Sequence, residues 1–437
     1  MGRTTIVAAG LSRLTINRSF GLLWSAQALS SIGEYLMAST ITVWLATTLA
    51  ADDPQLPLFI GGVVVATALP KIVLTPFVGV WVDRWPAKTV MMTADLVRAG
   101  LYGPFIAVTF LMQPSVLPVV VIAMQLLISC ASQFFTPARS ALIQVVIPHE
   151  RRASASGRSV FSTMGAGILA TMAGPAVFAA LGPRPAFVVD ALSFVVSACL
   201  VAFVRERGVL AGRRRDRYWH ELADGLRAAW GSRRLRLLII GMGGYGISLG
   251  VNNATLSLFA LKTIGLAPLQ YGTVSAMFSV GGLVGSFLAP AAVQRVRPER
   301  AMAVALTILS ATYLVYAAVR SFGAAAVLML LAGLAFSVYV VAQGPILQTE
   351  VAVGSMGRVS SLTTPVLAIA SVTATAVASN ILGGLRPAVV ASIGYPVAIA
   401  AAAALMGAAG VVLVVASRRL RSSPEMDLTR AVPGRPG

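Results

Sequence analysis

The decapeptide Gly79-Val80-Trp81-Val82-Asp83-Arg84-Trp85-Pro86-Ala87-Lys88 is one of the few polar interruptions in a chain that is otherwise strongly apolar. It joins an apolar stretch over residues 57–81 to another over residues 89–112. A helix that crosses a bilayer needs about 20 mainly apolar residues, because its backbone groups must be hydrogen-bonded without water. The decapeptide is therefore predicted to link two membrane-spanning helices.

The composition of the whole chain excludes an ordinary soluble protein. Of the 437 residues, 57% are hydrophobic and 11% are charged, and the mean hydropathy is +0.83. A soluble domain has roughly 25% charged residues. The fold class predicted is an all-α polytopic membrane protein. Its twelve spans are expected over residues 20–50, 57–81, 89–112, 116–147, 154–181, 185–204, 236–262, 269–293, 300–319, 322–350, 356–384 and 387–417.

Basic residues orient the predicted spans. They concentrate in alternate connections, namely Arg13, Arg18, Arg84, Lys88, Arg151, Arg152, Arg158, the segment 205–236, Arg295, Arg297, Arg300, Arg358, Arg418, Arg419 and Arg421. The opposite connections hold few basic residues and contain Asp52 and Asp53. Because positive loops stay in the cytoplasm, both termini are predicted to be cytoplasmic, in a multi-pass protein of the inner (cytoplasmic) membrane.

The chain contains a weak internal repeat at a separation of 211 residues. It pairs Pro57-Leu58 with Pro268-Leu269, Gly61 with Gly272, and Arg84 with Arg295. Two parallel six-helix halves would produce such a pattern. The predicted domains are an N-terminal half (1–204), a basic cytoplasmic linker (205–235), a C-terminal half (236–417) and a disordered cytoplasmic tail (418–437).

The loop between the second and third spans resembles the signature loop of the major facilitator superfamily. The residues that match are Gly79, Asp83, Arg84 and Lys88, whereas Pro86 and Ala87 depart from the usual pattern. Further segments resemble the branch that contains macrolide-efflux pumps and the enterobactin exporter. They are residues 20–30, Asp95-Leu96-Val97-Arg98-Ala99, Pro137-Ala138-Arg139, residues 190–194 and residues 357–361.

The resemblance implies that this loop is a gate that steadies one state of the transporter. Asp83 is expected to face the positive N-terminus of the eleventh span near Gly357. The alternative is a solvated turn that only sets topology. In the fifth span, Gly174-Pro175 resembles the antiporter motif of drug exporters, although Phe178 and Ala179 replace its final glycines. Close helix packing is the alternative explanation for that segment.

Two ionisable residues are predicted deep in the first two spans. Glu34 lies 16 residues beyond Arg18, about 24 Å along a helix, and Lys71 lies 12 residues before Asp83, about 18 Å. Charges in such positions are expensive and mark functional sites by default. Either the two residues form a structural ion pair, or Glu34 binds a proton or a cationic substrate.

Other polar residues in the predicted spans are expected to have lesser roles. Asn252, Asn253 and Gln343 are expected to face Glu34 across a central cavity and to contact a ligand there, with packing between helices as the alternative. Asp95 and Arg98 are expected to form a structural pair near the cytoplasm. Asp190 and Glu350 are expected to be interfacial charges near the ends of spans.

These features favour a secondary transporter and give no support to an enzyme. The chain has no P-loop motif and no Cys/His/carboxylate set with metal-ligand spacing, so no cofactor and no metal are expected. We predict proton-coupled export of an amphipathic small molecule, such as an antibiotic, drug or siderophore-like compound, by a monomer that contacts membrane lipids and no nucleic acid. The alternatives are a lysophospholipid or lipid flippase of the same fold, and a membrane sensor that transports nothing.

Overall fold

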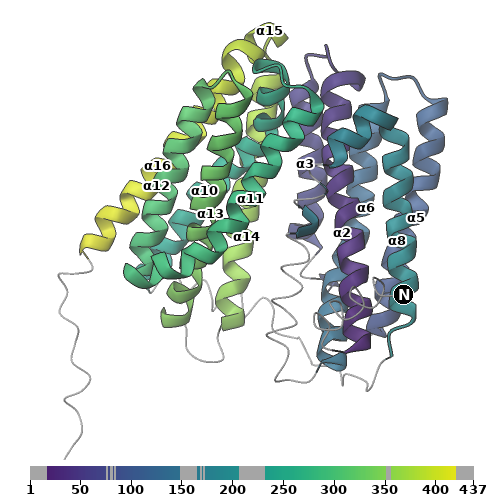
Figure 1. Cartoon of the computed structure of the whole chain (residues 1–437), viewed down its shortest axis with the longest axis horizontal. Coiled ribbons are helices and arrows are strands. Elements are labelled where there is room, and N and C mark those ends of the chain that lie inside the picture. Colours follow the sequence, from purple (N-terminus) through teal and green to yellow (C-terminus); the bar gives the residue numbers. More distant parts are fainter. Residues whose placement is uncertain are drawn as a thin grey trace, which may run out of the picture.

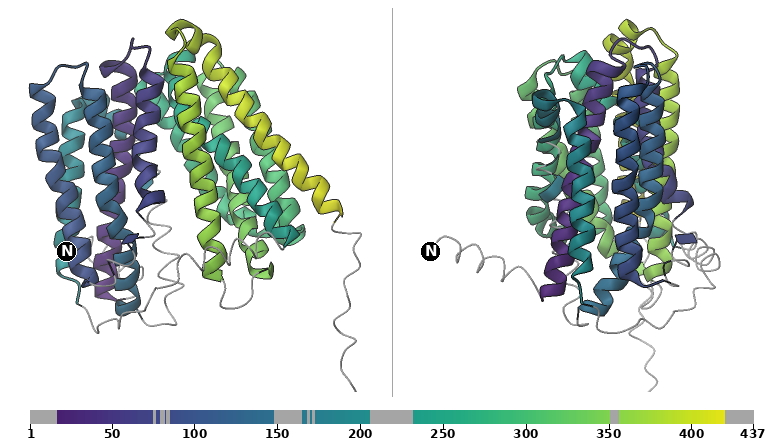
Figure 2. Two further views of the ribbon diagram at one scale, coloured as in Figure 1. Left: turned by 180° about the vertical axis from the view of Figure 1, so that it is seen from behind. Right: turned by 90° about the vertical axis from the view of Figure 1, so that its right-hand side faces the viewer.

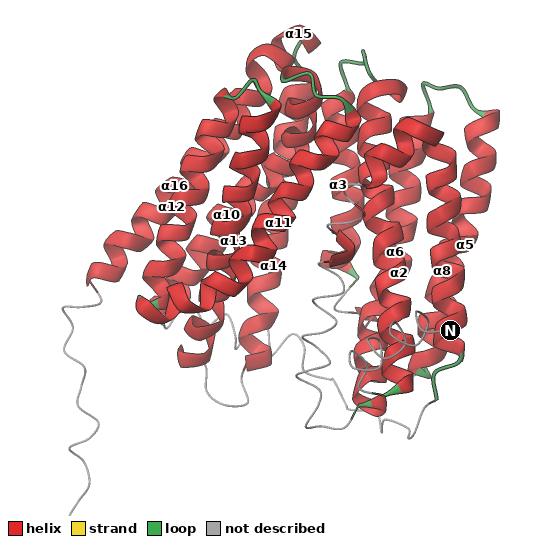
Figure 3. Ribbon diagram, in the orientation of Figure 1, coloured by secondary structure: helices red, strands yellow, loops and turns green. Residues whose placement is uncertain are grey.

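The computed structural model describes residues 17–74, 77–78, 82, 85–147, 165–167, 170, 173–205, 232–350 and 356–419. In these residues the regular structure is helical throughout (Figure 3). The helices form two bundles that stand side by side (Figures 1 and 2).

The N-terminal bundle contains long helices that match the first four predicted spans and the sixth. They are α2 (Arg18–Trp44), which continues into the π-helical turn η1 (Leu45–Leu49), α3 (Leu56–Val73), α5 (Ala87–Leu111), α6 (Leu117–Val146) and α8 (Pro183–Ala202). Residues 173–181 are also helical and precede α8.

The C-terminal bundle has a similar order. It consists of α10 (Arg233–Leu258), the π-helical turn η3 (Phe259–Thr263), α11 (Pro268–Arg295), α12 (Pro298–Ala318), α13 (Phe322–Glu350), α14 (Met356–Gly383), the short α15 (Pro387–Val389), the π-helical turn η4 (Val390–Gly394) and α16 (Tyr395–Arg419). The first helix of each bundle thus ends in a five-residue π-helical turn.

Ten helices in the described residues are long and apolar enough to cross a membrane. Helix α2 lies where the first span is predicted, but it is not among these ten helices. Its polar side chains include Gln27, Ser30 and Glu34. The predicted span 154–181 lies largely outside the described residues. The all-helical membrane fold is therefore confirmed, and the count of twelve spans stays a prediction.

The sequence sets where many of these helices begin. Proline occupies one of the first two positions of α3, α6, α8, α11 and α12, where the missing N–H costs no hydrogen bond. Helix α2 is instead capped by Asn17, whose Oδ1 accepts from the Phe20 N–H at 2.7 Å. Short connections follow several helices, so neighbours such as α11 and α12 run antiparallel.

Small residues allow close packing inside the C-terminal bundle. A Cβ at Gly281 would lie 2.0 Å from the Leu330 carbonyl oxygen, and one at Gly333 would lie 2.0 Å from that of Phe278. Helices α11 and α13 thus approach backbone to backbone, as is common for helices that pack in lipid. No side chain larger than hydrogen fits at these two positions.

The two bundles meet through α3 and α14 near the predicted exterior end. A Cβ at Gly61 would lie 1.8 Å from Ser379 Oγ, and one at Gly383 would lie 2.7 Å from Leu58 Cγ. Figure 1 shows the bundles meeting at the end that carries α15 and diverging toward the opposite end. The contacts between α3 and α14 therefore bring the halves together at one end of the molecule.

A lysine adds a polar link at the same end. Lys262 Nζ in η3 donates to the carbonyl oxygen of Ala51 at 2.8 Å. The two residues are 211 positions apart, the separation found for the internal repeat. A cavity of about 300 Å³ opens beside this contact, with Asp53, Pro387 and Tyr395 in its lining.

Candidate functional site

A buried polar network connects α2, α5 and α8 in the N-terminal bundle. Arg98 Nη1 donates to Glu34 Oε1 at 2.7 Å, and Arg98 Nη2 contacts Asp95 Oδ1 one turn earlier on α5. Ser197 Oγ on α8 donates to the second Asp95 oxygen at 2.6 Å. One guanidinium group therefore holds two carboxylates from different helices.

The members of this network differ in their exposure. Arg98 and Asp95 are 1% and 0% exposed, whereas the Glu34 side chain is 48% exposed. The Arg98 guanidinium also lies over the rings of Phe194 and Phe135, at 4.2 and 4.9 Å from their centroids. Such cation–π contacts help to stabilise a charge that has left water. Arg98 thus links a fully buried carboxylate to one that is accessible.

The network follows two antiparallel helix faces. Positions three and four apart share one face of a helix, and α5 and α8 present such faces to each other. The facing pairs are Tyr102 with Asp190, Arg98 with Phe194, and Asp95 with Ser197. The polar contacts therefore extend over two helical turns between the two helices.

Asp190 lies beside this network, on the face of α8 that also carries Ser197. Its Oδ2 accepts from the Tyr102 hydroxyl at 2.5 Å, and its Oδ1 lies 3.3 Å from Ser193 Oγ. A Cβ at Gly33 would lie only 2.2 Å from Asp190 Oδ1, so glycine is needed next to Glu34 for this approach. Asp190 is 1% exposed and lies seven residues into α8, about 10 Å from that end of the helix. The expectation of an interfacial charge was wrong for this residue.

The other predicted cavity residues lie at separate places. Lys71 is exposed in the last turn of α3, and the ion-pair partner of Glu34 is Arg98. Asn252 is buried on α10, where its Nδ2 lies 3.5 Å from Ser248 Oγ, and its neighbour Asn253 is exposed.

Gln343 on α13 donates to the Tyr339 carbonyl at 3.3 Å, one turn earlier on the same helix. Asn252 and Gln343 thus each have a partner in their own helix. Their predicted role opposite Glu34, together with that of Asn253, stays a prediction.

The predicted gating loop is described only at its end. Gly79, Asp83 and Arg84 lie outside the described residues. Lys88 Nζ donates to the carbonyl oxygen of Val204 at 3.0 Å, just beyond the last turn of α8. A lysine in this position satisfies a carbonyl that the helix leaves free, so Lys88 anchors the start of α5 to the end of α8.

The antiporter-like segment packs tightly against α2. A Cβ at Gly174 would lie 1.9 Å from Ser39 Oγ and 2.7 Å from the Leu36 carbonyl oxygen, and Thr40 Oγ1 donates to the Gly174 carbonyl at 3.4 Å. Pro175 follows within the helical residues 173–181. Gly174 therefore has a packing role, and a role of the segment in antiport stays a prediction.

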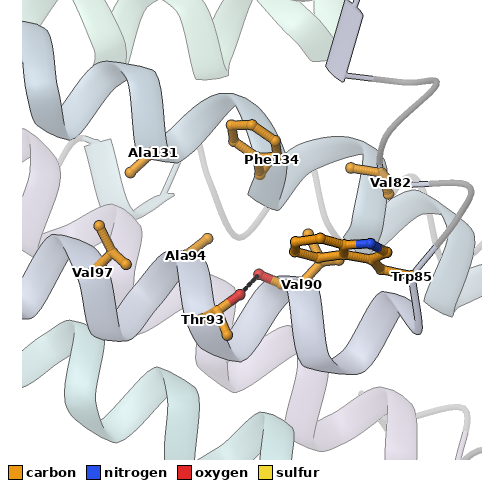
Figure 4. Close-up of a pocket in the computed structure, with 8 residues that line it drawn as sticks. All are labelled: Val82, Trp85, Val90, Thr93, Ala94, Val97, Ala131 and Phe134. Atoms are coloured by element: carbon orange, nitrogen blue, oxygen red, sulfur yellow. Dashed lines mark hydrogen bonds between the residues drawn. The ribbon is translucent and has the colours of Figure 1, made fainter.

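An apolar cavity of about 540 Å³ lies between α5 and α6 (Figure 4). Its lining consists of Val82, Trp85, Val90, Thr93, Ala94, Val97, Ala131 and Phe134. Trp85 and Val97 are more than half exposed, so the cavity opens at the surface of the bundle. Ala94 precedes Asp95, which places this cavity beside the polar network.

Sequence reasoning assigned no functional role to Arg98, Tyr102 and Asp190. A signal was available, because polar residues recur at i, i+3 and i+7 in both helices, as Asp95, Arg98 and Tyr102 and as Asp190, Ser193 and Ser197. Within the described part of the chain, no group of three His, Cys, Asp or Glu residues could hold a metal ion.

Long apolar helices in two bundles, with an ionisable network inside one of them, define a multi-pass membrane transporter. The family model of the Major Facilitator Superfamily matches residues 23–375, and the chain belongs to this superfamily. The membership predicted from the loop after the second span is thus confirmed. Family and fold are those of transporters and not of enzymes.

Curated relatives match parts of the chain at low identity. The uncharacterized MFS-type transporter YkuC of Bacillus subtilis is 28% identical over 260 residues, which cover 55% of this chain and 58% of that protein. Macrolide efflux protein A of Streptococcus pyogenes is 25% identical over 274 residues, which cover 62% of this chain and 65% of that protein. The chain thus matches less than two thirds of the length of each.

Solved structures share the fold over nearly the whole chain. A bacterial homologue of the iron transporter ferroportin, in an inward-facing state, aligns with a TM-score of 0.73 at 16% identity and covers 92% of this chain and 99% of its own. A bacterial homologue of the human lysosomal transporter Spinster, inward-facing and unoccupied, gives 0.71 at 15% identity and covers 94% and 100%.

Proposed function

We propose that this protein is a secondary active exporter of an amphipathic small molecule, such as an antibiotic, a drug or a siderophore-like compound. It works by proton antiport and alternating access. The observation that carries this proposal is Glu34, an accessible carboxylate paired at 2.7 Å with the buried Arg98 inside the bundle. Efflux, rather than uptake, is supported by the similarity to a protein named macrolide efflux protein A.

The structure corresponds, in this proposal, to the inward-facing state. The contacts of Gly61 with Ser379 and of Lys262 with Ala51 close the predicted exterior end. In this state Glu34 has released its proton, and Arg98 stabilises the carboxylate. Opening toward the exterior lets Glu34 bind a new proton, which breaks its ion pair and resets the transporter.

The energy available from protons is sufficient for such export. One proton that moves down a membrane potential of about 100 mV releases about 2.3 kcal/mol, which supports a roughly fortyfold gradient of a neutral solute at one-to-one coupling. No ATP site is required for a gradient of this size.

The test is efflux from cells that express Glu34→Gln, measured with a panel of fluorescent amphipathic compounds with and without an uncoupler. The variant keeps the side-chain shape but cannot ionise, so we expect uphill efflux to be lost while passive equilibration of substrate continues. The matched control is Glu299→Gln. Glu299 Oε1 lies 3.2 Å from Arg234 Nε in the C-terminal bundle, and the network lies in the N-terminal bundle. Uncoupler-sensitive efflux that persists in Glu34→Gln would exclude Glu34 as the coupling residue.

The orientation of the protein in the membrane, which determines whether transport is export or uptake, is tested separately. A reporter fused after Ser423 should lie in the cytoplasm, and one inserted near Asp52 should lie outside. Reversed signals would contradict the predicted orientation and with it the direction of transport.

A second candidate is a lipid or lysophospholipid flippase. The observation in its favour is the surface-opening apolar cavity between α5 and α6, because an acyl chain needs a lateral apolar path. Transport of a fluorescent lysophospholipid in proteoliposomes, blocked by Ala131→Trp in the cavity lining, would favour the flippase over the exporter of soluble compounds.

A further inference from the structure

Asp190 differs from the other two carboxylates of the network in the kind of partner that it has. Glu34 and Asp95 both contact the Arg98 guanidinium, which can only donate hydrogen bonds. Asp190 Oδ2 accepts instead from the Tyr102 hydroxyl, and Oδ1 lies 3.3 Å from the Ser193 hydroxyl. A hydroxyl group can donate and accept, so it remains a partner whether or not the carboxyl carries a proton.

The geometry around Asp190 Oδ1 suits a protonated carboxyl. Ser193 Oγ lies 2.8 Å from the Asp190 backbone carbonyl oxygen and 3.3 Å from Oδ1, and its single hydrogen can be donated to either acceptor. When that hydrogen is donated to the nearer carbonyl, an Oγ lone pair is left for Oδ1. A proton on Oδ1 would be donated to that lone pair, and Oδ2 would continue to accept from Tyr102. All hydrogen-bonding groups of the carboxyl are then used.

The charged groups around Asp190 also favour one protonated carboxyl, because there are more carboxyl groups than positive charges to pair with them. The charged and titratable groups around Asp190 come from three helices. Helix α2 contributes Glu34, next to Gly33, and α5 contributes Asp95, Arg98 and the neutral Tyr102. Helix α8 adds the hydroxyl groups of Ser193 and Ser197. Three carboxyl groups thus lie near one guanidinium, which contacts two of them, Glu34 and Asp95. An ionised group that is out of water without a charged partner is costly.

Arg98 keeps one unused donor in this network. Its Nε–H is buried and has no acceptor among the described residues, although both terminal nitrogens are occupied. An acceptor brought next to this N–H would complete the hydrogen bonding of Arg98.

We propose that Asp190 is a second proton-binding site of the transporter, coupled electrostatically to Glu34, which follows the α2 residue Gly33 that packs against Asp190. Binding forms one O–H bond at Oδ1 with a proton from water, and release breaks that bond and returns the proton to water. This site deepens the proposed antiport and rests on it for its role in transport. Proton binding itself can be measured without substrate.

The experiment is infrared difference spectroscopy between low and high pH on the purified full-length protein in lipid nanodiscs. The C=O stretching band of a protonated carboxyl should appear in the wild type and shift in D2O, and a component of it should be missing from Asp190→Asn. Asparagine keeps the size and the acceptor for Tyr102. Glu299→Gln is the control and should leave that component in place.

Tyr102→Phe provides a second variant if Asp190→Asn does not fold. It removes only the hydroxyl that donates to Oδ2, so the same component should remain and move to higher frequency. If both variants fold, a band that is unchanged in both would overturn the proposal. If Asp190→Asn cannot be purified, a band that is unchanged in Tyr102→Phe would overturn it. If Asp190→Asn loses the component but the wild type exports nothing, the proton site stands and the proposed export is rejected. If the wild type exports with proton coupling but the band is unchanged in the variants, the proposed export stands and the proton site is rejected.

Discussion

Replacing Gly61 by alanine should move the two bundles apart at the predicted exterior end. The added Cβ would lie 1.8 Å from Ser379 Oγ and 2.5 Å from Ser379 Cβ. Rotation of the serine can relieve the first clash but not the second, because Cβ is fixed to the α14 backbone. Helices α3 and α14 must therefore separate, or the pair must bear the strain.

The size of the effect follows from the cost of overpacking. Forcing one methyl group into a closely packed contact costs about 1–3 kcal/mol. If the exterior-open state does not contain this contact, the ratio of exterior-open to exterior-closed molecules should rise about 5- to 150-fold. A single methyl group is thus expected to change the resting state of the transporter.

The assay is a distance measurement between spin labels at Asp53 and Arg386, in a background where Cys130 and Cys199 are replaced. Both labelled positions are exposed near the 300 Å³ cavity at this end. The unmodified protein should give a short distance, and Gly61→Ala should add a longer one. The control is Gly100→Ala on α5, where a Cβ would meet nothing within 4 Å. Identical distance distributions for the two variants would refute the reasoning.

Three further predictions concern the fold and the network. Gly333→Ala should lower the unfolding temperature in detergent, since overpacking costs about 1–3 kcal/mol, whereas Gly243→Ala, with open space around its Cβ, should not. Lys262→Met removes a charge-assisted hydrogen bond worth about 1.5–3 kcal/mol and should raise the exterior-open fraction in the same spin-label assay. Arg98→Met should cost about 3–5 kcal/mol and reduce the yield of folded protein in gel filtration. Asp95→Asn in the same chain should restore part of that yield, because it removes one of the two carboxylates left unpaired.

The fold could be predicted closely because apolar length is a local property of the sequence. The expected span at 300–319 corresponds to α12 at Pro298–Ala318, and the span at 116–147 corresponds to α6 at Leu117–Val146. The second span is predicted to reach residue 81, and α3 is described as far as Val73, with helical residues again at 77, 78 and 82. Pro70 lies inside α3, where it removes a backbone donor that hydropathy alone does not take into account.

The site could be predicted only in part, because pairing between helices depends on how each helix is rotated. The sequence identified Glu34 as a costly charge and Asp95 with Arg98 as a local pair. It did not indicate that Arg98 reaches Glu34, which lies 64 residues earlier in the chain. Lys71 was considered as the partner because depth can be counted along a helix, whereas the direction of a side chain cannot.

The two polar stripes on α5 and α8 show what would have completed the prediction. Polar residues at i, i+3 and i+7 place three side chains on one face, and an isolated span with such a face would expose it to lipid at high cost. Two stripes of this kind in one bundle must therefore face each other or face water. When helices run antiparallel, the pairing order reverses, and Tyr102 meets Asp190 while Asp95 meets Ser197. The same reasoning explains why Asp190 has hydroxyl partners. One arginine pairs with two carboxylates, and the third carboxyl needs partners that can hydrogen-bond to it with or without its proton.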